Sequence, residues 1–256
     1  GLAKQGMIPV VAIYSTFLQR AYDQIVHDVC LQNLPVCILS DHVGLVGDDG
    51  KTHHGVLSVP MLMSIPNLTL LAPRDTRQIR QAVRATLKLD GPCVVQYPKE
   101  GIEPYAQNVT GEPFAVGKWQ TLIPGGQDAV ILAYGRMTQN AIQASELLVQ
   151  RGLSVGVIDC CSLKPLDMDC LRALFERKAK IVTIEEGEMI GGFGSEIARV
   201  CVEENADAPV QIIGLENRFI THGSVPELLR ECGLTPEQLA DRIEEIAGDK
   251  ESSHVG

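Results

Sequence analysis

The stretch AIYSTFLQRAYDQ, from Ala12 to Gln24, decides the fold because it turns a short strand directly into a helix. Residues 9–13 form an apolar run that is too short for a helix and begins with a proline, so they predict a core strand. The buried stripe of the following helix is marked by apolar residues at helical spacing: Leu18, Ala21, Ile25 and Val29. Phe17 and Arg20 lie on another face of this helix, near its start. An aromatic ring beside a guanidinium at the carboxyl edge of a strand suits a flat heteroaromatic ligand with anionic groups.

A second segment, GDDGKTHHG from Gly47 to Gly55, follows another predicted strand that covers Val36 to Asp41. Its glycines allow a tight turn and a close approach to a ligand. Asp49 can bind hydroxyl groups, and His53 or His54 can exchange protons near neutral pH. Taken alone, the segment would rather be interpreted as a glycine-rich surface loop with solvated charges.

Strands and helices alternate along the chain in two blocks, which predicts an α/β fold with two doubly wound, mainly parallel sheets. The expected strands cover residues 9–14, 35–41, 68–73 and 93–98 in the first block, and 128–134, 154–159, 180–185 and 210–215 in the second. The expected helices cover residues 16–31, 58–64, 75–89, 138–151, 167–177, 194–204, 225–232 and 236–247. The stretch between the blocks is rich in proline and glycine, and it predicts a linker that is partly structured around Phe114 and Trp119. We therefore expect three segments: a first domain over 1–110, a linker over 111–127 and a second domain over 128–256.

Both opening segments closely resemble the 1-deoxy-D-xylulose 5-phosphate synthases, a thiamine diphosphate-dependent family of the transketolase superfamily. The likeness covers almost the whole chain and continues through five further blocks: IPNLTLLAPRD (Ile65 to Asp75), GP…QYP (Gly91 to Pro98), LKPLD (Leu163 to Asp167), EEGEMIGGFGSEI (Glu185 to Ile197) and RFITHGSVPELLRECGLTPEQLADRI (Arg218 to Ile243). The resemblance implies a truncated pyrimidine-binding domain followed by a transketolase C-terminal domain. It also implies a decarboxylating condensation of pyruvate with glyceraldehyde 3-phosphate, on the route to isoprenoid precursors, with thiamine diphosphate and Mg²⁺ as cofactors.

The resemblance assigns roles to residues that follow the predicted strands of the first domain. Phe17 matches the ring that stacks on the cofactor pyrimidine, and Tyr14 and Arg20 match residues near the pyrimidine and the substrate. Asp49 and His53 match the polar pair near the substrate hydroxyls. For Tyr14 or Phe17 alone, ordinary core packing would be the favoured interpretation, and their place inside the full motif reverses it.

Two positions of this sequence depart from the family at the expected substrate phosphate site. His42 and Lys99 stand where the synthases usually carry arginines that hold the phosphate, and Glu100 follows Lys99. Lysine keeps the charge but lacks the bidentate fork of arginine, and a largely neutral histidine lacks most of both. The departures therefore weaken the case for glyceraldehyde 3-phosphate as acceptor more than the case for the fold or the cofactor.

Complete members of the family are much longer than 256 residues. Their amino-terminal domain carries a GDG motif, with an asparagine at a fixed spacing, that binds Mg²⁺ and the diphosphate, and this chain contains no such motif. We expect the chain to begin inside a domain, as a fragment, a split subunit or a truncated chain would, and to be inactive by itself. Its expected partners are the missing amino-terminal part and a second copy in a homodimer. Two alternatives stay open: the carboxyl-terminal subunit of a split transketolase-like enzyme with a different acceptor, and a noncatalytic paralogue.

The composition argues against several other classes of protein. The formal charge is -10 with no basic run, which argues against a nucleic acid partner. No apolar run is long enough to span a membrane, and no signal peptide pattern is present at the start, so we expect a cytoplasmic protein. The 8 cysteines lie mostly in predicted core elements without a CxxC motif, which favours unpaired, buried thiols and no structural zinc.

The second domain carries weaker signals. The segment GGFGS, residues 191–195, lacks the third glycine of a dinucleotide fingerprint and is more typical of a tight strand-to-helix turn. Glu185, Glu186 and Glu188 are expected in the first turn beside a helix amino terminus, and Ser224 is expected to cap a helix. We assign no chemistry to this domain, whose role in the superfamily is packing and dimer formation.

Overall fold

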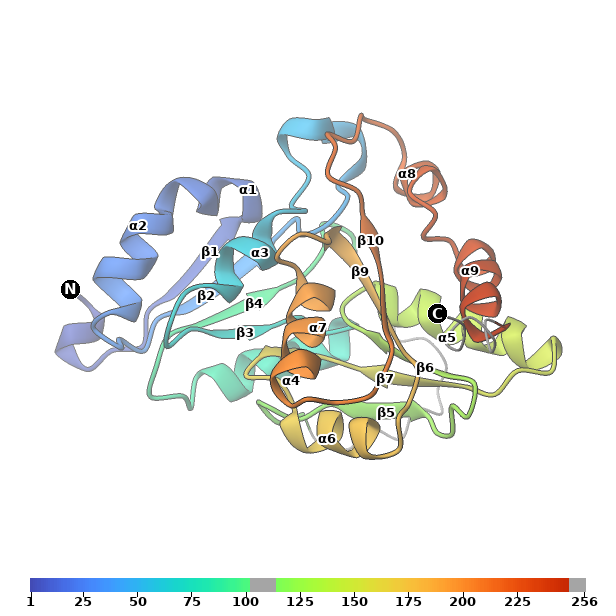
Figure 1. The fold of residues 1–256 in the computed structure, drawn as a ribbon. Helices are drawn as coiled ribbons and strands as arrows, with labels where there is room; N and C mark the ends of the chain where they lie inside the picture. The colour runs from blue at the N-terminus through green and yellow to red at the C-terminus, as the bar shows by residue number, and fades with distance from the viewer. Residues whose placement is uncertain (102–113, 249–256) are drawn as a thin grey trace.

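A computed structural model describes residues 1–101 and 114–248. It contains two five-stranded sheets with helices packed against them (Figure 1). The strand orders are β1-β2-β4-β3-β8 in the first sheet and β10-β9-β6-β7-β5 in the second, and most pairs are parallel, which confirms the predicted α/β class. The predicted domain boundary at residue 110 and the start of the predicted linker lie outside the described residues.

The bounds of the strands and helices are as follows. The strands are β1 Val10–Tyr14, β2 Cys37–Asp41, β3 Thr69–Leu71, β4 Cys93–Gln96, β5 Gln120–Ile123, β6 Ala129–Ala133, β7 Val155–Asp159, β8 Ser162–Lys164, β9 Ile181–Glu188 and β10 Val210–Leu215. The helices are α1 Ser15–Leu18, α2 Tyr22–Gln24, α3 Ser58–Met63, α4 Thr76–Thr86, α5 Met137–Gln150, α6 Met168–Glu176, α7 Phe193–Glu203, α8 Val225–Glu231 and α9 Pro236–Gly248.

Two antiparallel strands were not expected from the sequence. β5 pairs with β7 at the edge of the second sheet. β8 follows β7 in the chain but pairs with β3, so it completes the first sheet instead of the second. β5 lies inside the stretch that the sequence assigned to a linker, and β8 has only three residues, in the connection between an expected strand and an expected helix.

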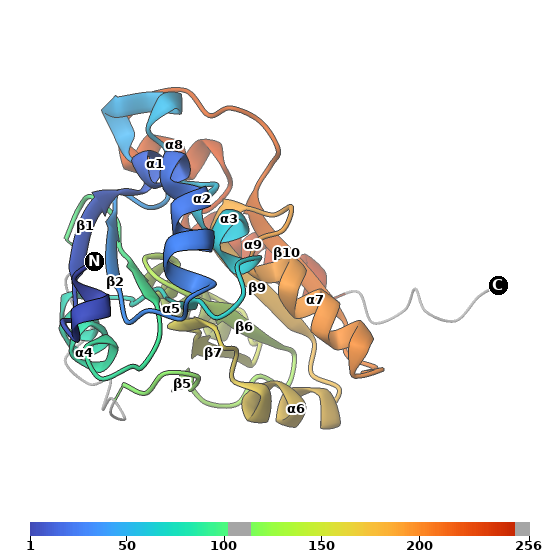
Figure 2. The same cartoon turned by 90° about the vertical axis from the view of Figure 1, so that its left-hand side faces the viewer.

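The prediction of a core strand over residues 9–13 is right about the strand and wrong about the core. Among the described strands β1 pairs with β2 alone, and it forms the edge of the first sheet (Figure 2). Val10 and Val11 are therefore 49% and 41% exposed. An apolar run predicts burial only where neighbouring elements cover both faces of the strand, and β1 lacks such cover in the described residues.

The helix expected over residues 16–31 is present in extent but is not continuous. It comprises α1, a 3₁₀ turn over Gln19–Ala21, α2 and a π-helical stretch over Ile25–Cys30. Leu18 and Ile25 are buried as the apolar stripe predicts. The winding changes at Gln19, so residues after it do not keep the angular positions that a regular helix would give them.

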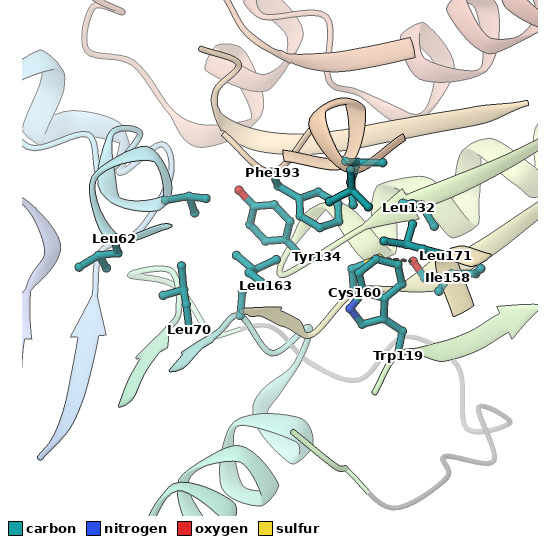
Figure 3. Packing of buried hydrophobic residues seen from close by; sticks show 14 of the residues in the cluster. Leu62, Leu70, Trp119, Leu132, Tyr134, Ile158, Cys160, Leu163, Leu171 and Phe193 are labelled. Atoms are coloured by element: carbon teal, nitrogen blue, oxygen red, sulfur yellow. Dashed lines mark hydrogen bonds between the residues drawn. The ribbon is translucent and has the colours of Figure 1, made fainter. Parts of the chain in front are cut away.

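The main hydrophobic core passes between the two sheets (Figure 3). Leu62 and Leu70 contribute to it from the first domain. Trp119 contributes from the predicted linker, and Leu163 and Phe193 contribute from the second domain. Trp119 is buried, and its indole N–H donates to the Ser162 carbonyl at 2.8 Å. Phe114 is only partly buried, against a small separate cluster. The two sheets therefore share one core rather than meeting at a thin interface.

A buried polar network also crosses between the sheets. The Arg74 guanidinium, which follows β3, forms an ion pair with Asp159 at the end of β7 and donates to the Gln120 side chain at 2.7 Å. Gln78 donates to the same carboxylate at 2.6 Å, and Asp75 lies 3.4 Å from the Arg74 Nε. Asp159 is fully buried, and burial raises its pKa although Arg74 opposes the shift. Each charge in the network thus has a partner in the other domain or beside it.

The expectation that Glu185, Glu186 and Glu188 lie in a first helical turn is wrong, because β9 extends to Glu188. The Glu185 side chain nevertheless lies at the amino terminus of α7, where the helix dipole favours a carboxylate. It accepts hydrogen bonds from the amides of Phe193 at 3.0 Å and Gly194 at 2.8 Å. The GGFGS segment forms the tight turn into α7, with Gly191 at φ +71°. At α8 the Ser224 amide donates to Glu227 at 3.0 Å in a capping box, as expected.

All eight cysteines are free, and six of them are buried, in agreement with unpaired thiols in core elements. Within residues 1–101 and 114–248, no helix is long and apolar enough to cross a membrane.

Candidate functional site

The candidate site lies at the carboxyl edge of the first sheet. Tyr14 and Asp41 end β1 and β2 and pair in register, and Ser40 pairs with Gln96 at the end of β4. Residues that follow these strands therefore meet at one edge, where ligands bind in open parallel sheets.

Two segments, β1 with α1 and the stretch after β2, bring four rings together in an aromatic cluster at this edge: Tyr14, Phe17, His42 and His53. Tyr14 stacks on His42 with ring centroids 4.0 Å apart, and Phe17 lies 5.0 Å from Tyr14. His53 meets Tyr14 edge-on at 5.5 Å and Phe17 edge-on at 6.2 Å. Phe17 is 57% exposed, so one flat apolar ring remains open for stacking beside the other three.

Local backbone contacts hold this cluster together. α1 begins at Ser15, directly after Tyr14, and the Ser15 hydroxyl donates to the His42 carbonyl at 2.7 Å. His42 has a φ of +55°, which turns the chain sharply at the end of β2. Gly55 returns to the same place, and a Cβ there would collide with the His42 carbonyl and the Ser15 hydroxyl. Residues 42–55 thus form a closed loop, called here the 42–55 loop.

Lys99 and Asp49 form an ion pair at the rim of the site, with 2.7 Å between Nζ and Oδ2. The hydrogen bond from Lys99 lowers the pKa of Asp49, and the same bond raises the pKa of Lys99. Both groups are therefore charged at neutral pH. The pair is solvent-exposed, so a ligand that binds either partner can displace it at little cost.

Tyr14 provides a hydroxyl that stays protonated. Burial raises its pKa to about 12, and the carboxylates of Asp49 and Asp41 add to the shift. Its Oη lies 3.4 Å from the His53 carbonyl, at the outer limit of a hydrogen bond. The phenol can therefore donate to a ligand oxygen without losing its proton.

The structure separates the two histidines that the sequence left equivalent. His54 is buried, and its Nδ1 accepts from the Val46 amide at 3.1 Å while its Nε2 lies 3.0 Å from the Thr221 carbonyl. Both of its ring nitrogens are occupied, so it has a structural role. His53 is partly exposed inside the aromatic cluster, and its Nδ1 lies 2.9 Å from the Thr52 hydroxyl.

Arg20 is not brought into this cluster. It lies exposed on the 3₁₀ turn after α1 and forms no hydrogen bond or ion pair within the described part of the chain. Beside it, a cleft of about 490 Å³ opens between α1 and the segment after β10, lined in part by Gln19, Lys51 and Arg218.

The residues at this edge fit one part of a cofactor. The exposed Phe17 ring beside other rings suits a planar heteroaromatic group. In residues 1–101 and 114–248, no group of three or more His, Cys, Asp or Glu side chains is arranged to hold a metal ion.

The contact of the second domain with the 42–55 loop was not predicted from the sequence. The Glu186 carboxylate accepts from the Leu45 amide at 2.7 Å, and Gly44 packs directly against it. Figures 1 and 2 both place the 42–55 loop beside the segment between β10 and α8. The glycines of the loop were the one available signal, since a close approach requires them.

Comparisons with known proteins agree on a family. The transketolase pyrimidine-binding domain profile matches residues 1–103, and the transketolase C-terminal domain profile matches residues 117–239. The 1-deoxy-D-xylulose-5-phosphate synthase of Rippkaea orientalis is 42% identical over 96% of this chain and 39% of its own length. That of Geobacillus thermodenitrificans is 44% identical over 98% of this chain and 40% of its own length. The chain thus spans about two fifths of these curated relatives.

Solved structures agree on the fold. A structure described as a split gene transketolase, inactive beta4 tetramer, superposes with a TM-score of 0.84 at 28% identity, over 95% of this chain and 77% of that one. A transketolase from Campylobacter jejuni superposes with a TM-score of 0.78 at 18% identity, over 95% of this chain and 36% of that one.

Proposed function

Since this chain belongs to the transketolase family and carries its pyrimidine-binding and C-terminal domains, we propose that it is the C-terminal part of a 1-deoxy-D-xylulose 5-phosphate synthase. The proposed reaction condenses pyruvate with an aldehyde, glyceraldehyde 3-phosphate in the resembled family, and releases carbon dioxide. The observation that carries the proposal is the open Phe17 ring in an aromatic cluster at the carboxyl edge of a parallel sheet, in a chain with 40–44% identity to such synthases.

Each residue of the candidate site, and Arg20 near it, has a proposed role. Phe17 stacks on the pyrimidine of the cofactor, and Arg20 lies near it. Tyr14 donates a hydrogen bond to the substrate because its phenol keeps its proton. Asp49 binds a substrate hydroxyl, and His53 exchanges a proton with the bound substrate. Two further side chains, His42 and Lys99, contact the aldehyde acceptor at the rim of the site.

Thiamine diphosphate, when bound, would supply the carbanion chemistry that removes carbon dioxide from pyruvate and joins the remaining carbons to the aldehyde. The ligands of its diphosphate and of Mg²⁺ would come from the rest of the enzyme. We propose that the complete enzyme is a cytoplasmic homodimer that serves the synthesis of isoprenoid precursors.

A second candidate is the carboxyl-terminal subunit of a split transketolase-like enzyme. The superposition on a chain described as a split gene transketolase, of which this chain covers 77%, favours it. His42 and Lys99 favour it as well, since they suit an acceptor other than the phosphorylated one.

Cofactor binding tests the proposal directly. We expect the 256-residue chain to show no saturable binding of thiamine diphosphate with Mg²⁺ in isothermal titration. The complete enzyme, with its native upstream region, is expected to bind it at one site per chain. A clear one-site isotherm for the isolated chain would contradict the assignment of the diphosphate ligands to another part.

Phe17→Ala in the complete enzyme should then weaken cofactor binding by about fivefold or more, because an aromatic contact is worth ~1 kcal/mol beyond its buried area. Tyr22→Ala is the matched control, since this partly exposed ring lies on the same helical segment but contacts Ser64 instead. Equal affinities for the two variants would remove Phe17 from the cofactor site.

A further inference from the structure

The 42–55 loop is anchored to the second domain and not only to the sheet that it follows. Leu45 is fully buried in the hydrophobic cluster of the second sheet, among residues such as Ile184 and Ile213. The loop closes at its base, where the Gly55 amide donates to the Gly44 carbonyl at 2.8 Å. A displacement of Gly44 and Leu45 should therefore also move the other residues of the loop, including those at its tip.

Glu186 holds this base. Its Oε1 accepts from the Leu45 amide at 2.7 Å, and its Oε2 lies 3.5 Å from the Arg136 Nε. A Cβ added to Gly44, which has a φ of +78°, would come within 2.7 Å of the Glu186 carboxyl carbon. The Glu186 carboxylate thus fills the space beside Gly44 and accepts a hydrogen bond from the amide of the next residue, Leu45.

Arg136 in turn has no other partner for its charge among the described residues. Both of its Nη atoms are buried without a hydrogen bond, and so is the side-chain amide of Gln96. These groups line a cavity of about 30 Å³ beneath Gly44, which has room for one or two ordered water molecules. Arg136 and Glu186 therefore form one buried polar unit that ends at the Leu45 amide.

Two further contacts hold the rest of the loop against the second domain. His54 links the Val46 amide to the Thr221 carbonyl. At the tip, a Cβ on Gly50 would lie 3.2 Å from the His222 Cβ, so the loop packs closely on that segment.

We propose that Glu186 is a positioning residue for the acceptor site: its carboxylate fixes the base of the loop whose tip carries Asp49 and His53. The second domain then acts on catalysis through this loop, beyond packing. The effect on catalysis rests on the proposed function, whereas the effect on the loop does not.

Amide hydrogen exchange of the 256-residue chain tests the loop itself. Glu186→Gln removes the charge from the acceptor of the Leu45 amide, and exchange over residues 43–55 should become roughly tenfold to a hundredfold faster. Exchange in β6 should stay unchanged. Glu188→Gln is the matched control, since Glu188 is also buried on β9 but its carboxylate faces the Ile190 amide. Unchanged loop exchange in Glu186→Gln, the same acceleration in both variants, or acceleration throughout the chain would overturn the proposal.

Activity of the complete enzyme provides the second readout. Glu186→Gln should keep the rate of carbon dioxide release from pyruvate without acceptor, while kcat/KM for the aldehyde falls about tenfold. A parallel loss of both activities would make Glu186 merely structural. If the wild-type enzyme shows no activity that depends on thiamine diphosphate, the proposed function fails, and the exchange result still decides the role of Glu186 in the loop.

Discussion

Replacing Arg74 by methionine is expected to destabilise the chain by about 3–5 kcal/mol at neutral pH. Methionine keeps the length and packing of the side chain but leaves Asp159 fully buried without a counter-charge. Among the side chains of residues 1–101 and 114–248, the Asp159 carboxylate would retain the hydrogen bond from Gln78 at 2.6 Å and a longer one from Thr138 at 3.4 Å. Two neutral donors cannot offset the cost of burying an ionised carboxylate.

The size of the loss should depend on pH, with a sign that follows from the Asp159 carboxyl. Burial already raises the pKa of Asp159 above its ordinary value of 3.8, and loss of Arg74 removes the main opposing charge. The folded variant therefore binds a proton that the unfolded chain releases. Its stability is greatest below the unfolded pKa and is lost as the pH rises through the folded pKa. The loss relative to wild type should accordingly be smaller at pH 5 than at pH 8.

Thermal and urea unfolding measure this effect. A loss of 3–5 kcal/mol corresponds to a fall in Tm of roughly 6–20 °C for a chain of this size. Arg77→Met is the control, since Arg77 is exposed on α4, and it should cost less than about 0.5 kcal/mol. The double variant Arg74→Met, Asp159→Asn should be more stable than Arg74→Met alone, because the buried charge of Asp159 is then absent, while the buried Asp75 carboxylate is the same in both variants. Additive losses, or a loss that is independent of pH, would refute the reasoning from an uncompensated carboxylate.

Two other expectations concern the acceptor site and a buried acid. In the complete enzyme, His42→Arg with Lys99→Arg should raise kcat/KM for glyceraldehyde 3-phosphate, relative to glyceraldehyde, by about tenfold, since the bidentate bonds of a guanidinium to phosphate exceed the single bonds that an imidazole or an ammonium group offers. An unchanged ratio in a folded, cofactor-saturated enzyme would mean that neither residue contacts the phosphate. Burial raises the pKa of Glu185 from 4.5 to about 7, so its contribution to stability should be lost as the pH rises across that window. Urea unfolding between pH 4.5 and 8 should show a shallower decline for Glu185→Gln than for the wild type, and parallel curves would contradict this role of Glu185.

The sequence predicted most of the site because parallel strands place their carboxyl ends together. Tyr14, Phe17, His42 and His53 follow the ends of two neighbouring strands, so the parallel alternation was enough to expect them at one edge. The ion pair of Lys99 with Asp49 was not expected, because a strand pattern gives no side-chain distances. The proposed roles of these residues remain predictions.

Other features could not be predicted from the sequence, for physical reasons. The contact of Glu186 with Leu45 joins residues 141 positions apart, and periodicity reports only on local structure. The exposure of Val10 depends on what covers β1, which no pattern within β1 can show. The expected helix over residues 16–31 contains a 3₁₀ turn at Gln19–Ala21 and a π-helical stretch at Ile25–Cys30, and apolar spacing alone does not distinguish these forms from a regular helix.

The pairing of β8 with β3 limits how the two domains can be exchanged during evolution. The strand β8 belongs to the second domain by sequence and to the first by its pairing with β3. A genetic exchange at the segment between the domains would bring a foreign strand to β3, or none, and would leave the backbone of β3 open to association with other chains. A gene fusion or fission that separates these halves must therefore preserve the match between β3 and β8. The two domains are more readily passed on together, as one evolutionary module, than exchanged singly.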